Sequence, residues 1–155
     1  MISNTNLRRL FAAYILILIY GMVIYHRNLD FTWIVTGGWP KLQQLMAETT
    51  NLIPFATINR YLSVLDRPSG LGLFLYNVIS NVLIFIPFGY LMPLAAKRFK
   101  TLVWVAFWGL LLILSIEGLQ YVSMSGSLDV DDVLLNFVGI LIGFWLSPLS
   151  KKRWF

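Results

Sequence analysis

The chain has 155 residues, of which 58% are hydrophobic, 15% are aromatic and only 12% are charged, and its mean hydropathy is +0.74. Because soluble domains carry about 25% charged residues, this composition excludes an ordinary soluble domain and predicts an all-α integral membrane protein. The net charge of +5 comes without cysteine, so disulfides, thiolate metal sites and a cysteine nucleophile are also excluded.

Four apolar segments are predicted to cross the membrane as helices, which gives a four-helix transmembrane bundle in one domain over residues 1–155. The first is a charge-free run from Leu10 to Tyr25 that follows Arg8 and Arg9. No small-residue cleavage site follows the run, so we expect an uncleaved span rather than a signal peptide. In the second segment a kink is predicted near Pro87, which lacks a backbone donor. The predicted spans lie at about 8–26, 74–96, 101–120 and 132–149.

The long loop between the first two spans is predicted to contain a short amphipathic helix. Pro40 follows Trp39, and the apolar residues Leu42, Leu45 and Met46 then recur at helical spacing. Such a pattern is typical of an interfacial helix that lies on the outer leaflet with a tryptophan as its anchor. A helix that caps the bundle would have the same pattern, and the sequence leaves both alternatives open.

Hydrogen-bonding residues interrupt the last three spans at a common depth. Within each pair the spacing is three or four residues, which places both members on one helical face. We therefore expect a polar pocket that opens outward, although hydrogen bonds between helices would explain the asparagines equally well. The pairs are Asn77 and Asn81 in the second span, Glu117 and Gln120 in the third, and Asp132 and Asn136 in the fourth.

Small residues continue these polar faces toward the other end of the spans. Gly139 and Gly143 are four residues apart in the last span, and Gly109 lies below Glu117 in the third. Because small residues let helix backbones approach closely in a membrane, this stripe predicts a tight contact between spans.

Glu117 is a carboxylate expected within a span, whereas Asp132 opens one. Charged residues in this environment are costly and usually mark a functional site or a paired charge. No Lys, Arg or His lies within the last three spans. Glu117 would therefore be protonated, be solvated from the outer mouth, or pair with Arg60 or Arg67 from the outer loop.

Three acids precede or open the fourth span, namely Asp129, Asp131 and Asp132. Asp131 or Asp132 would suit the N-terminus of that helix. Together with other oxygen ligands the three could instead hold a divalent cation, but the run lacks the glycine and the distal glutamate of a calcium loop. We therefore expect no cofactor, and a metal site at these three residues is the alternative.

The basic residues are distributed very unevenly between the two sides of a four-span topology. One side receives eight of them and no acid, whereas the other receives four basic and six acidic residues. By the positive-inside rule both termini are cytoplasmic. The positive charge is thus explained by topology, and no nucleic acid partner is expected. The eight are Arg8, Arg9, Lys97, Arg98, Lys100, Lys151, Lys152 and Arg153.

Four segments taken together resemble the VanZ family. The family takes its name from a protein linked to low-level resistance to teicoplanin, a lipid-tailed glycopeptide antibiotic. The resemblance runs from about Asn51 to Gly143 and implies a protein of the bacterial cytoplasmic membrane connected with the cell envelope. The segments are Asn51–Phe55 (NLIPF), Asn81–Gly89 (NVLIFIPFG), Ser115–Gln120 (SIEGLQ) and Asp129–Gly139 (DVDDVLLNFVG).

The chain departs from the family pattern just before the acidic run. The family commonly has a Gly-Arg pair there, whereas this chain has Gly126 and Ser127. If that arginine binds an anionic head group in the family, the role is lost here or passes to Arg60 or Arg67.

Two functions follow as hypotheses from the sequence. One is a binding protein for membrane lipids, lipid-linked cell-wall intermediates or a lipoglycopeptide, either alone or as a homo-oligomer. The other is an intramembrane enzyme that uses Glu117 and Asp132 on a lipid-linked substrate, since paired carboxylates can divide acid and base roles. The candidate ligand-binding residues are Asn51, Asn77, Asn81, Glu117, Gln120, Asp129, Asp131, Asp132 and Asn136.

Overall fold

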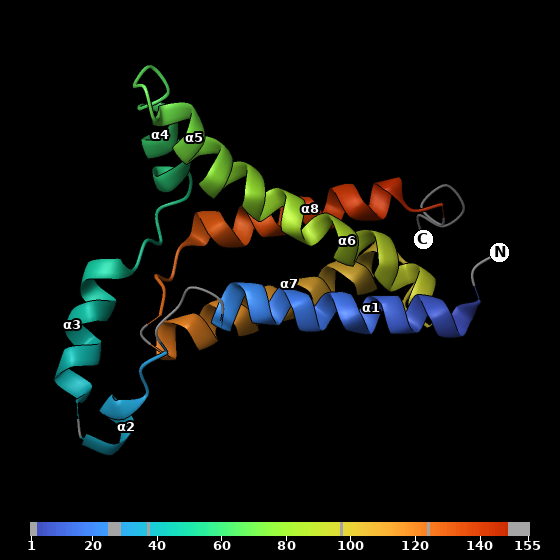
Figure 1. Ribbon diagram of the computed structural model, residues 1–155, viewed down its shortest axis with the longest axis horizontal. Coiled ribbons are helices and arrows are strands. Elements are labelled where there is room, and N and C mark those ends of the chain that lie inside the picture. The colour runs from blue at the N-terminus through green and yellow to red at the C-terminus, as the bar shows by residue number, and fades with distance from the viewer. Residues whose placement is uncertain (1–2, 25–28, 37, 97, 124, 149–155) are drawn as a thin grey trace.

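The computed structural model describes residues 3–24, 29–36, 38–96, 98–123 and 125–148 (Figure 1). These residues form helices and no named strand, with one isolated bridge between Asn51 and Asp129. In chain order the elements are α1 (Asn4–Ile19), the π-helix η1 (Tyr20–Ile24), α2 (Thr32–Thr36), α3 (Trp39–Thr49), α4 (Ala56–Leu62), α5 (Gly70–Phe74), the π-helix η2 (Leu75–Ile79), α6 (Ser80–Ala95), α7 (Leu102–Val122) and α8 (Val130–Leu146).

Three continuous helices are long and apolar enough to cross a membrane. They are Asn4–Ile24, Gly70–Ala95 and Leu102–Val122. The predicted fourth span corresponds to α8, which has 17 residues and carries Asp131 and Asp132 in its first turn. At 1.5 Å per residue α8 is about 25 Å long, shorter than a bilayer core of about 30 Å. A four-span bundle therefore stays a prediction.

The helix ends differ from the predicted ones by a few residues. The first helix begins at Asn4 because the Ser3 hydroxyl accepts the backbone N–H of Asn6 at 3.2 Å, which caps its N-terminus. Arg8 and Arg9 therefore lie inside α1 rather than before it. The second span begins at Gly70, and residues 25, 26 and 149 of the predicted spans lie outside the described residues.

The second span continues as a helix through Pro87 and Pro93. The Tyr14 hydroxyl of α1 donates to the Ile84 carbonyl at 2.7 Å, in the turn before Pro87, and also interacts with the Phe88 backbone. A side chain from a neighbouring helix thus bonds to the backbone one residue after Leu83, whose carbonyl has no i+4 donor because of Pro87.

The backbones of α6 and α8 approach so closely that their glycine positions leave no room for a Cβ atom. A Cβ atom added at Gly139 would lie 2.1 Å from the Val82 carbonyl oxygen, and one at Gly143 would lie 2.0 Å from that of Ile86. On α6 itself, Gly89 has the same relation to the Ile140 oxygen, at 2.0 Å. The predicted small-residue contact is therefore confirmed, and its main partner is α6.

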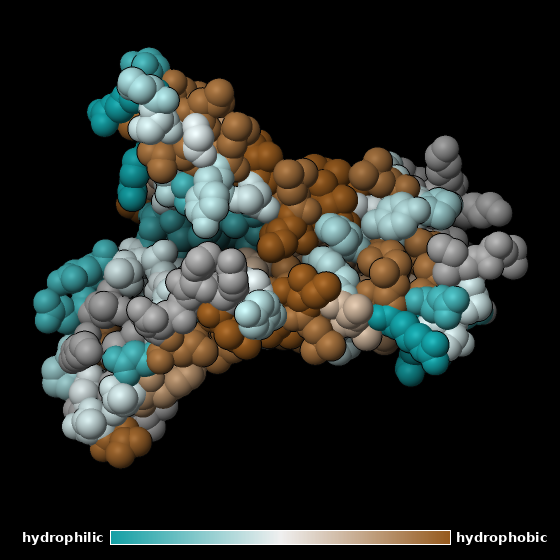
Figure 2. Space-filling model, viewed as in Figure 1, coloured by the Kyte–Doolittle hydropathy of each residue, from teal (hydrophilic) through white to brown (hydrophobic). Residues whose placement is uncertain are grey.

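The apolar core lies between α1, α6, α7 and α8, and many other apolar side chains are exposed on the outside. On the face that Figure 2 shows, a hydrophobic band covers the middle of the molecule, and hydrophilic surface gathers toward its two ends. This distribution suits a chain that is surrounded by lipid along its middle. The core includes Leu18, Phe85, Phe88, Ile113, Ile140 and Phe144.

We call the two ends of the bundle the polar end and the basic end. The polar end contains η1, η2, α2, α3, α4 and the start of α8, and the basic end contains Arg8, Ala95 and Arg98. Figure 1 shows α3 lying across the polar end rather than along the bundle. The predicted helix in this loop is thus present as α3, with Leu42 buried and Trp39 exposed. The side chains of Leu45 and Met46 lie outside what the structure describes, and placement on the outer leaflet stays a prediction.

Candidate functional site

At the polar end, Asp131 holds the start of α4 from a different helix. The Asp131 side chain is completely buried. Its Oδ1 accepts the N–H of Phe55 at 2.5 Å, and its Oδ2 accepts those of Thr57 at 2.8 Å and Ile58 at 3.1 Å. The first N–H groups of a helix have no acceptor within the helix. The Asp131 carboxylate therefore supplies the cap that Phe55, with its φ of 66°, does not provide.

Asn51 and Asp129 form the second part of this connection. The Asn51 Nδ2 donates to the Asp129 Oδ1 at 3.0 Å and to the Thr57 Oγ1 at 3.1 Å, and the Thr57 hydroxyl donates to the Asp129 Oδ2 at 2.6 Å. Backbone bonds join the same segments, from Val130 N–H to the Asn51 carbonyl at 2.9 Å. We call Asn51, Thr57, Asp129 and Asp131 the loop clamp.

The cap of α8 is Asp129, not Asp131 or Asp132 as the sequence predicted. The Asp129 Oδ1 accepts the N–H of Asp131 at 2.9 Å. The reason is that Asp131 is engaged by α4, and Asp132 faces α6.

The metal alternative gains no support from this arrangement. The oxygens of Asp129 and Asp131 accept protein hydrogen bonds, and Asp132 is directed to a different helix. Among the residues that the structure describes, no group of three or more His, Cys, Asp or Glu side chains is placed to hold a metal ion. The expectation of no cofactor and the metal alternative both stay predictions.

Asp132 contributes instead to a cavity of about 280 Å³ at the polar end. Its Oδ1 accepts a hydrogen bond of 2.6 Å from the Asn81 Nδ2. Amide, hydroxyl and carboxylate groups thus stand beside apolar ones on the same wall. We call this the polar cavity, and its lining is Gly21, Met22, Tyr76, Asn77, Ser80, Asn81, Ile84 and Asp132.

Both π-helical turns of the described chain line the polar cavity. Gly21 and Met22 belong to η1, and Tyr76 and Asn77 belong to η2. Side chains bond to carbonyls in or beside these turns: the Asn77 Nδ2 donates to the Leu73 oxygen at 2.8 Å, and the Gln120 Nε2 donates to the Met22 oxygen at 2.7 Å. Single π-helical turns are rare and occur frequently at functional sites.

Three predicted site residues are buried and do not line the polar cavity. The exposed fraction is 2% for Glu117, 3% for Gln120 and zero for Asn136. Neither amide atom of Asn136 has a hydrogen-bond partner within the described part of the chain. The convergence of Glu117 and Asn136 with Asn81 and Asp132 stays a prediction.

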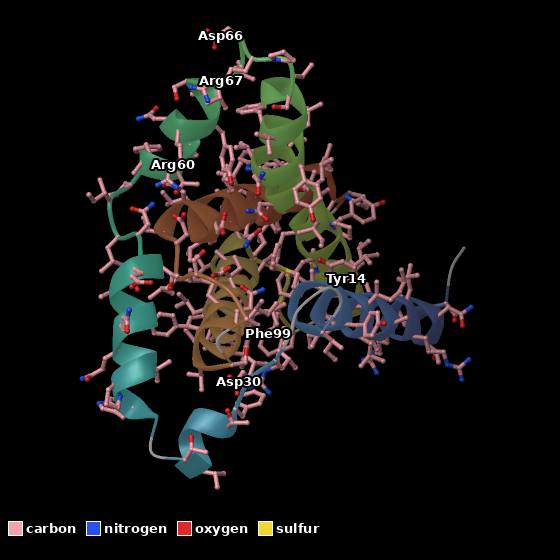
Figure 3. All side chains as sticks on the ribbon, turned by 60° about the vertical axis from the view of Figure 1, so that its left-hand side comes forward. Tyr14, Asp30, Arg60, Asp66, Arg67 and Phe99 are labelled. Carbon is pink, nitrogen blue, oxygen red and sulfur yellow. The ribbon has the colours of Figure 1, made fainter. Side chains whose placement is uncertain are left out.

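A second cavity of about 300 Å³ adjoins the loop clamp. Its lining includes both Arg60 and Ser127. Arg60, which belongs to α4, therefore lines the same cavity as Ser127, the position at which the family commonly has an arginine. Arg67 and Asp66 lie beyond α4, farther from the bundle (Figure 3). Arg60 and Arg67 are the replacements for the family arginine that the sequence suggests, and Arg60 is the one that lines this cavity. We call it the clamp cavity.

Comparisons with known proteins give the same family that the four sequence segments resemble. The model of the VanZ/LLP1 family matches residues 11–151. Protein VanZ of Enterococcus faecium is 34% identical over 140 residues, which cover 84% of this chain and 78% of that protein. The chain belongs to the VanZ/LLP1 family. No solved structure matches the chain.

Family membership and the three apolar helices together identify a VanZ-family membrane protein. The match begins at residue 11, within α1, and ends at residue 151, after α8. It therefore includes both π-helical turns, the loop clamp and the polar cavity. The features of the polar end lie within the part of the chain that defines the family.

The sequence did not reveal several residues at this site. Gly21, Met22, Tyr76 and Ser80 line the polar cavity, but nothing in their spacing distinguishes a π-helical turn from a regular one. Asn77 was the available signal, since an asparagine within a helix often bonds to a nearby carbonyl and competes with the regular ladder.

Proposed function

We propose that this VanZ-family protein binds the polar head group of a lipid-anchored ligand in the polar cavity. The ligand is a membrane lipid, a lipid-linked cell-wall intermediate or a lipoglycopeptide such as teicoplanin. One observation carries the proposal: Asp132 and Asn81 meet beside two π-helical turns on the wall of a cavity at the polar end of the apolar bundle. The family relationship supplies the connection with the cell envelope.

The proposal includes an orientation in the bacterial cytoplasmic membrane. The protein is multi-pass, α8 serves as its fourth span, and both termini are cytoplasmic. The charge distribution supports this, because Arg8, Arg9 and Arg98 lie at the basic end, whereas all acids except Glu117 belong to the polar end. The polar cavity then opens to the outer face, with α3 on the outer leaflet.

The lining of the polar cavity suits a head group that carries hydroxyl and amide groups. Asn77, Asn81 and Ser80 can both donate and accept hydrogen bonds, and Asp132 accepts them. Met22 and Ile84 supply apolar surface on the same wall. Sugars and peptides present such groups, and their lipid tail would lie along the hydrophobic band. In the clamp cavity, Arg60 offers a donor for a phosphate of the same ligand.

The geometry favours binding over catalysis. An intramembrane enzyme that uses Glu117 and Asp132 would need both carboxylates beside the reacting atoms. Asp132 lines the polar cavity, but Glu117 is 2% exposed and is not part of its wall. Only Asp132 of the two carboxylates that the enzymatic hypothesis requires therefore lies on the cavity wall. A binding protein requires only Asp132.

The proposal is tested by expressing variants in a susceptible bacterial host and measuring growth against two glycopeptides. One is teicoplanin, and the other has no lipid tail. We expect the native chain to reduce susceptibility to teicoplanin more than to the tail-free glycopeptide. Asp132→Asn keeps the shape and the acceptor for Asn81 but removes the charge, so it should abolish this difference.

Asp66→Asn is the matched control, because Asp66 is an exposed acid of the same outer loop that lines neither cavity. It should behave like the native chain. Equal protection against both antibiotics would exclude teicoplanin as the ligand, and full protection by the Asp132 variant at normal protein levels would overturn the proposal.

A further inference from the structure

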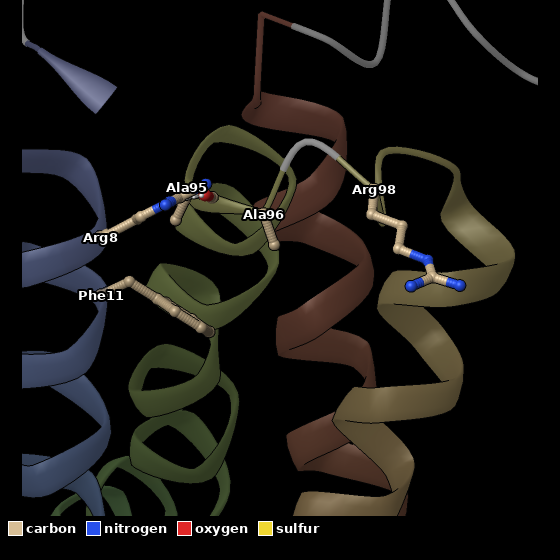
Figure 4. A pocket seen from close by; sticks show the side chains of 5 residues that line it. All are labelled: Arg8, Phe11, Ala95, Ala96 and Arg98. Carbon is tan, nitrogen blue, oxygen red and sulfur yellow. Dashed lines mark hydrogen bonds between the residues drawn. The ribbon is translucent and has the colours of Figure 1, made fainter. Parts of the chain in front are cut away.

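Two arginines flank a separate cavity at the basic end, opposite the proposed head-group site. Arg8 of α1 and Arg98 of the segment before α7 line a volume of about 510 Å³ together with Phe11, Ala95 and Ala96 (Figure 4). The lining is thus mainly apolar, with Arg8 on one side and Arg98 on the other, and in Figure 4 the Arg98 side chain is directed away from Arg8.

Neither guanidinium is neutralised by the described part of the chain. The side chain of Arg8 uses its Nε to donate to the Ala95 carbonyl at 3.3 Å, which fixes it at the C-terminus of α6. Its two terminal nitrogens, and the whole guanidinium of Arg98, form no hydrogen bond or ion pair with described residues. The sequence also has no Asp or Glu from Met1 to Leu29 or from Pro68 to Ile116.

Two further cavities share lining residues with this one. Phe11 also lines a cavity of about 230 Å³ whose other walls come from α1, α6 and α7. Arg98 also lines one of about 430 Å³ with Phe99, Trp104 and Trp108. Trp108 lines both of these, so the three cavities adjoin one another. We call them the basic-end groove. The walls of the 230 Å³ part are Phe11, Ile15, Phe88, Met92, Trp108 and Leu112.

We propose that the basic-end groove binds one anionic glycerophospholipid. Its phosphate binds Arg8 and Arg98, for which the exposed side chain of Arg98 turns toward Arg8, and one acyl chain follows Phe11, Phe88 and Met92 along the groove. Arginine pairs readily with phosphate oxygens, basic residues at a membrane surface attract anionic lipids, and tryptophans such as Trp104 and Trp108 anchor at head-group level. A second copy of the chain is the poorer occupant, because it would bring the same positive charges against each other.

This inference does not depend on the proposed function, since it concerns the other end of the molecule. It is tested by fluorescence of Trp108 in vesicles. The other five tryptophans are replaced by Phe, and the full chain is reconstituted in phosphatidylcholine. A tenth of the lipid is then exchanged for phosphatidylglycerol or phosphatidylcholine with brominated acyl chains, which quench a tryptophan in contact with them.

We expect brominated phosphatidylglycerol to quench Trp108 with a relative binding constant at least about fivefold above that of brominated phosphatidylcholine. Arg8→Gln combined with Arg98→Gln should remove this preference. Arg98→Gln alone should reduce it while the hydrogen bond from Arg8 to the Ala95 carbonyl stays in place. The matched control is Arg60→Gln combined with Arg67→Gln at the polar end, which should keep the preference.

Equal quenching by the two lipids in the single-tryptophan protein that keeps both arginines would overturn the inference. An equal loss in the control pair would do the same, because it would indicate general attraction to a charged membrane rather than a site. Protection of Trp108 from both lipids, with cross-linked dimers in the same vesicles, would assign the groove to a second copy of the chain.

Discussion

At the scale of single residues, three carboxylates that are nearly adjacent in sequence have three different environments. Asp129 caps α8, Asp131 caps α4 across the loop, and Asp132 meets Asn81 on the wall of the polar cavity. Asp129 has an extended backbone, whereas Asp131 and Asp132 lie in the first turn of α8. The three side chains therefore point in different directions. Of the three, only Asp132 combines a polar contact with access to that cavity.

The first prediction concerns Asp131. Asp131→Ala removes the acceptor of three N–H groups, and each buried donor without a partner costs about 1–3 kcal/mol. We expect a lower Tm in detergent and amide hydrogen exchange at least about tenfold faster at Phe55, Thr57 and Ile58. Asp66→Ala, which changes an exposed acid just beyond α4, should leave both unchanged. Unaltered exchange at the three amides would show that the loop clamp does not hold α4.

Glu117 gives the second prediction. Glu117→Gln conserves volume and hydrogen-bonding reach at a position that is 2% exposed, so packing should be maintained and only the ionisable group is lost. If Glu117 acts in ligand binding, the variant should keep the native Tm and lose the protection against teicoplanin. A lowered Tm would identify a structural carboxylate instead, and native behaviour in both assays would remove Glu117 from the site.

At the scale of elements, the sequence predicted the three long spans to within about four residues and also the small-residue contact of α8. Both follow from composition and spacing alone: apolar runs of sufficient length, and glycines four apart. The sequence could not reveal that the partner of Gly139 and Gly143 is α6, because pairing between helices depends on the whole bundle. It also missed η1 and η2, since a π-helical turn depends on which carbonyls a neighbouring side chain engages.

The third prediction tests the contact between α6 and α8. Gly139→Ala would place a Cβ 2.1 Å from the Val82 carbonyl oxygen, so the two helices must move apart. Overpacking of this kind costs about 1–3 kcal/mol, and we expect a clearly lower Tm. Gly118→Ala is the matched control, because nothing lies within 4 Å of its added Cβ and alanine favours the helix. Equal melting temperatures for the two variants would contradict the close contact.

At the scale of the whole molecule, the two ends have opposite chemistry. The polar end contains the loop clamp, the polar cavity and the clamp cavity, whereas the basic end contains Arg8, Arg98 and an apolar groove. Between them lies the hydrophobic band of Figure 2. The proposed orientation assigns each end to one side of the membrane, and it depends on α8 being a fourth span.

The fourth prediction tests that topology with reporter fusions after Asp66 and after Lys100. Alkaline phosphatase is active only outside the cytoplasmic membrane. We expect it to be active after Asp66 and inactive after Lys100, and a cytoplasmic reporter such as green fluorescent protein should give the reverse. The same compartment for both positions would exclude the four-span model with cytoplasmic termini.

The central claim is that the polar cavity opens outward and takes a lipid-anchored ligand, and single-cysteine labelling tests it most directly. The native chain has no cysteine, and Ser80 is exposed on the cavity wall. We predict that Ser80→Cys reacts with a membrane-impermeant maleimide in intact cells and that teicoplanin or a lipid-linked cell-wall intermediate slows the reaction several-fold. Ser63→Cys, at the end of α4 and outside the cavity, should react at the same rate with or without ligand. Labelling of Ser80→Cys only in inverted vesicles, or an unchanged rate with every ligand, would contradict the account.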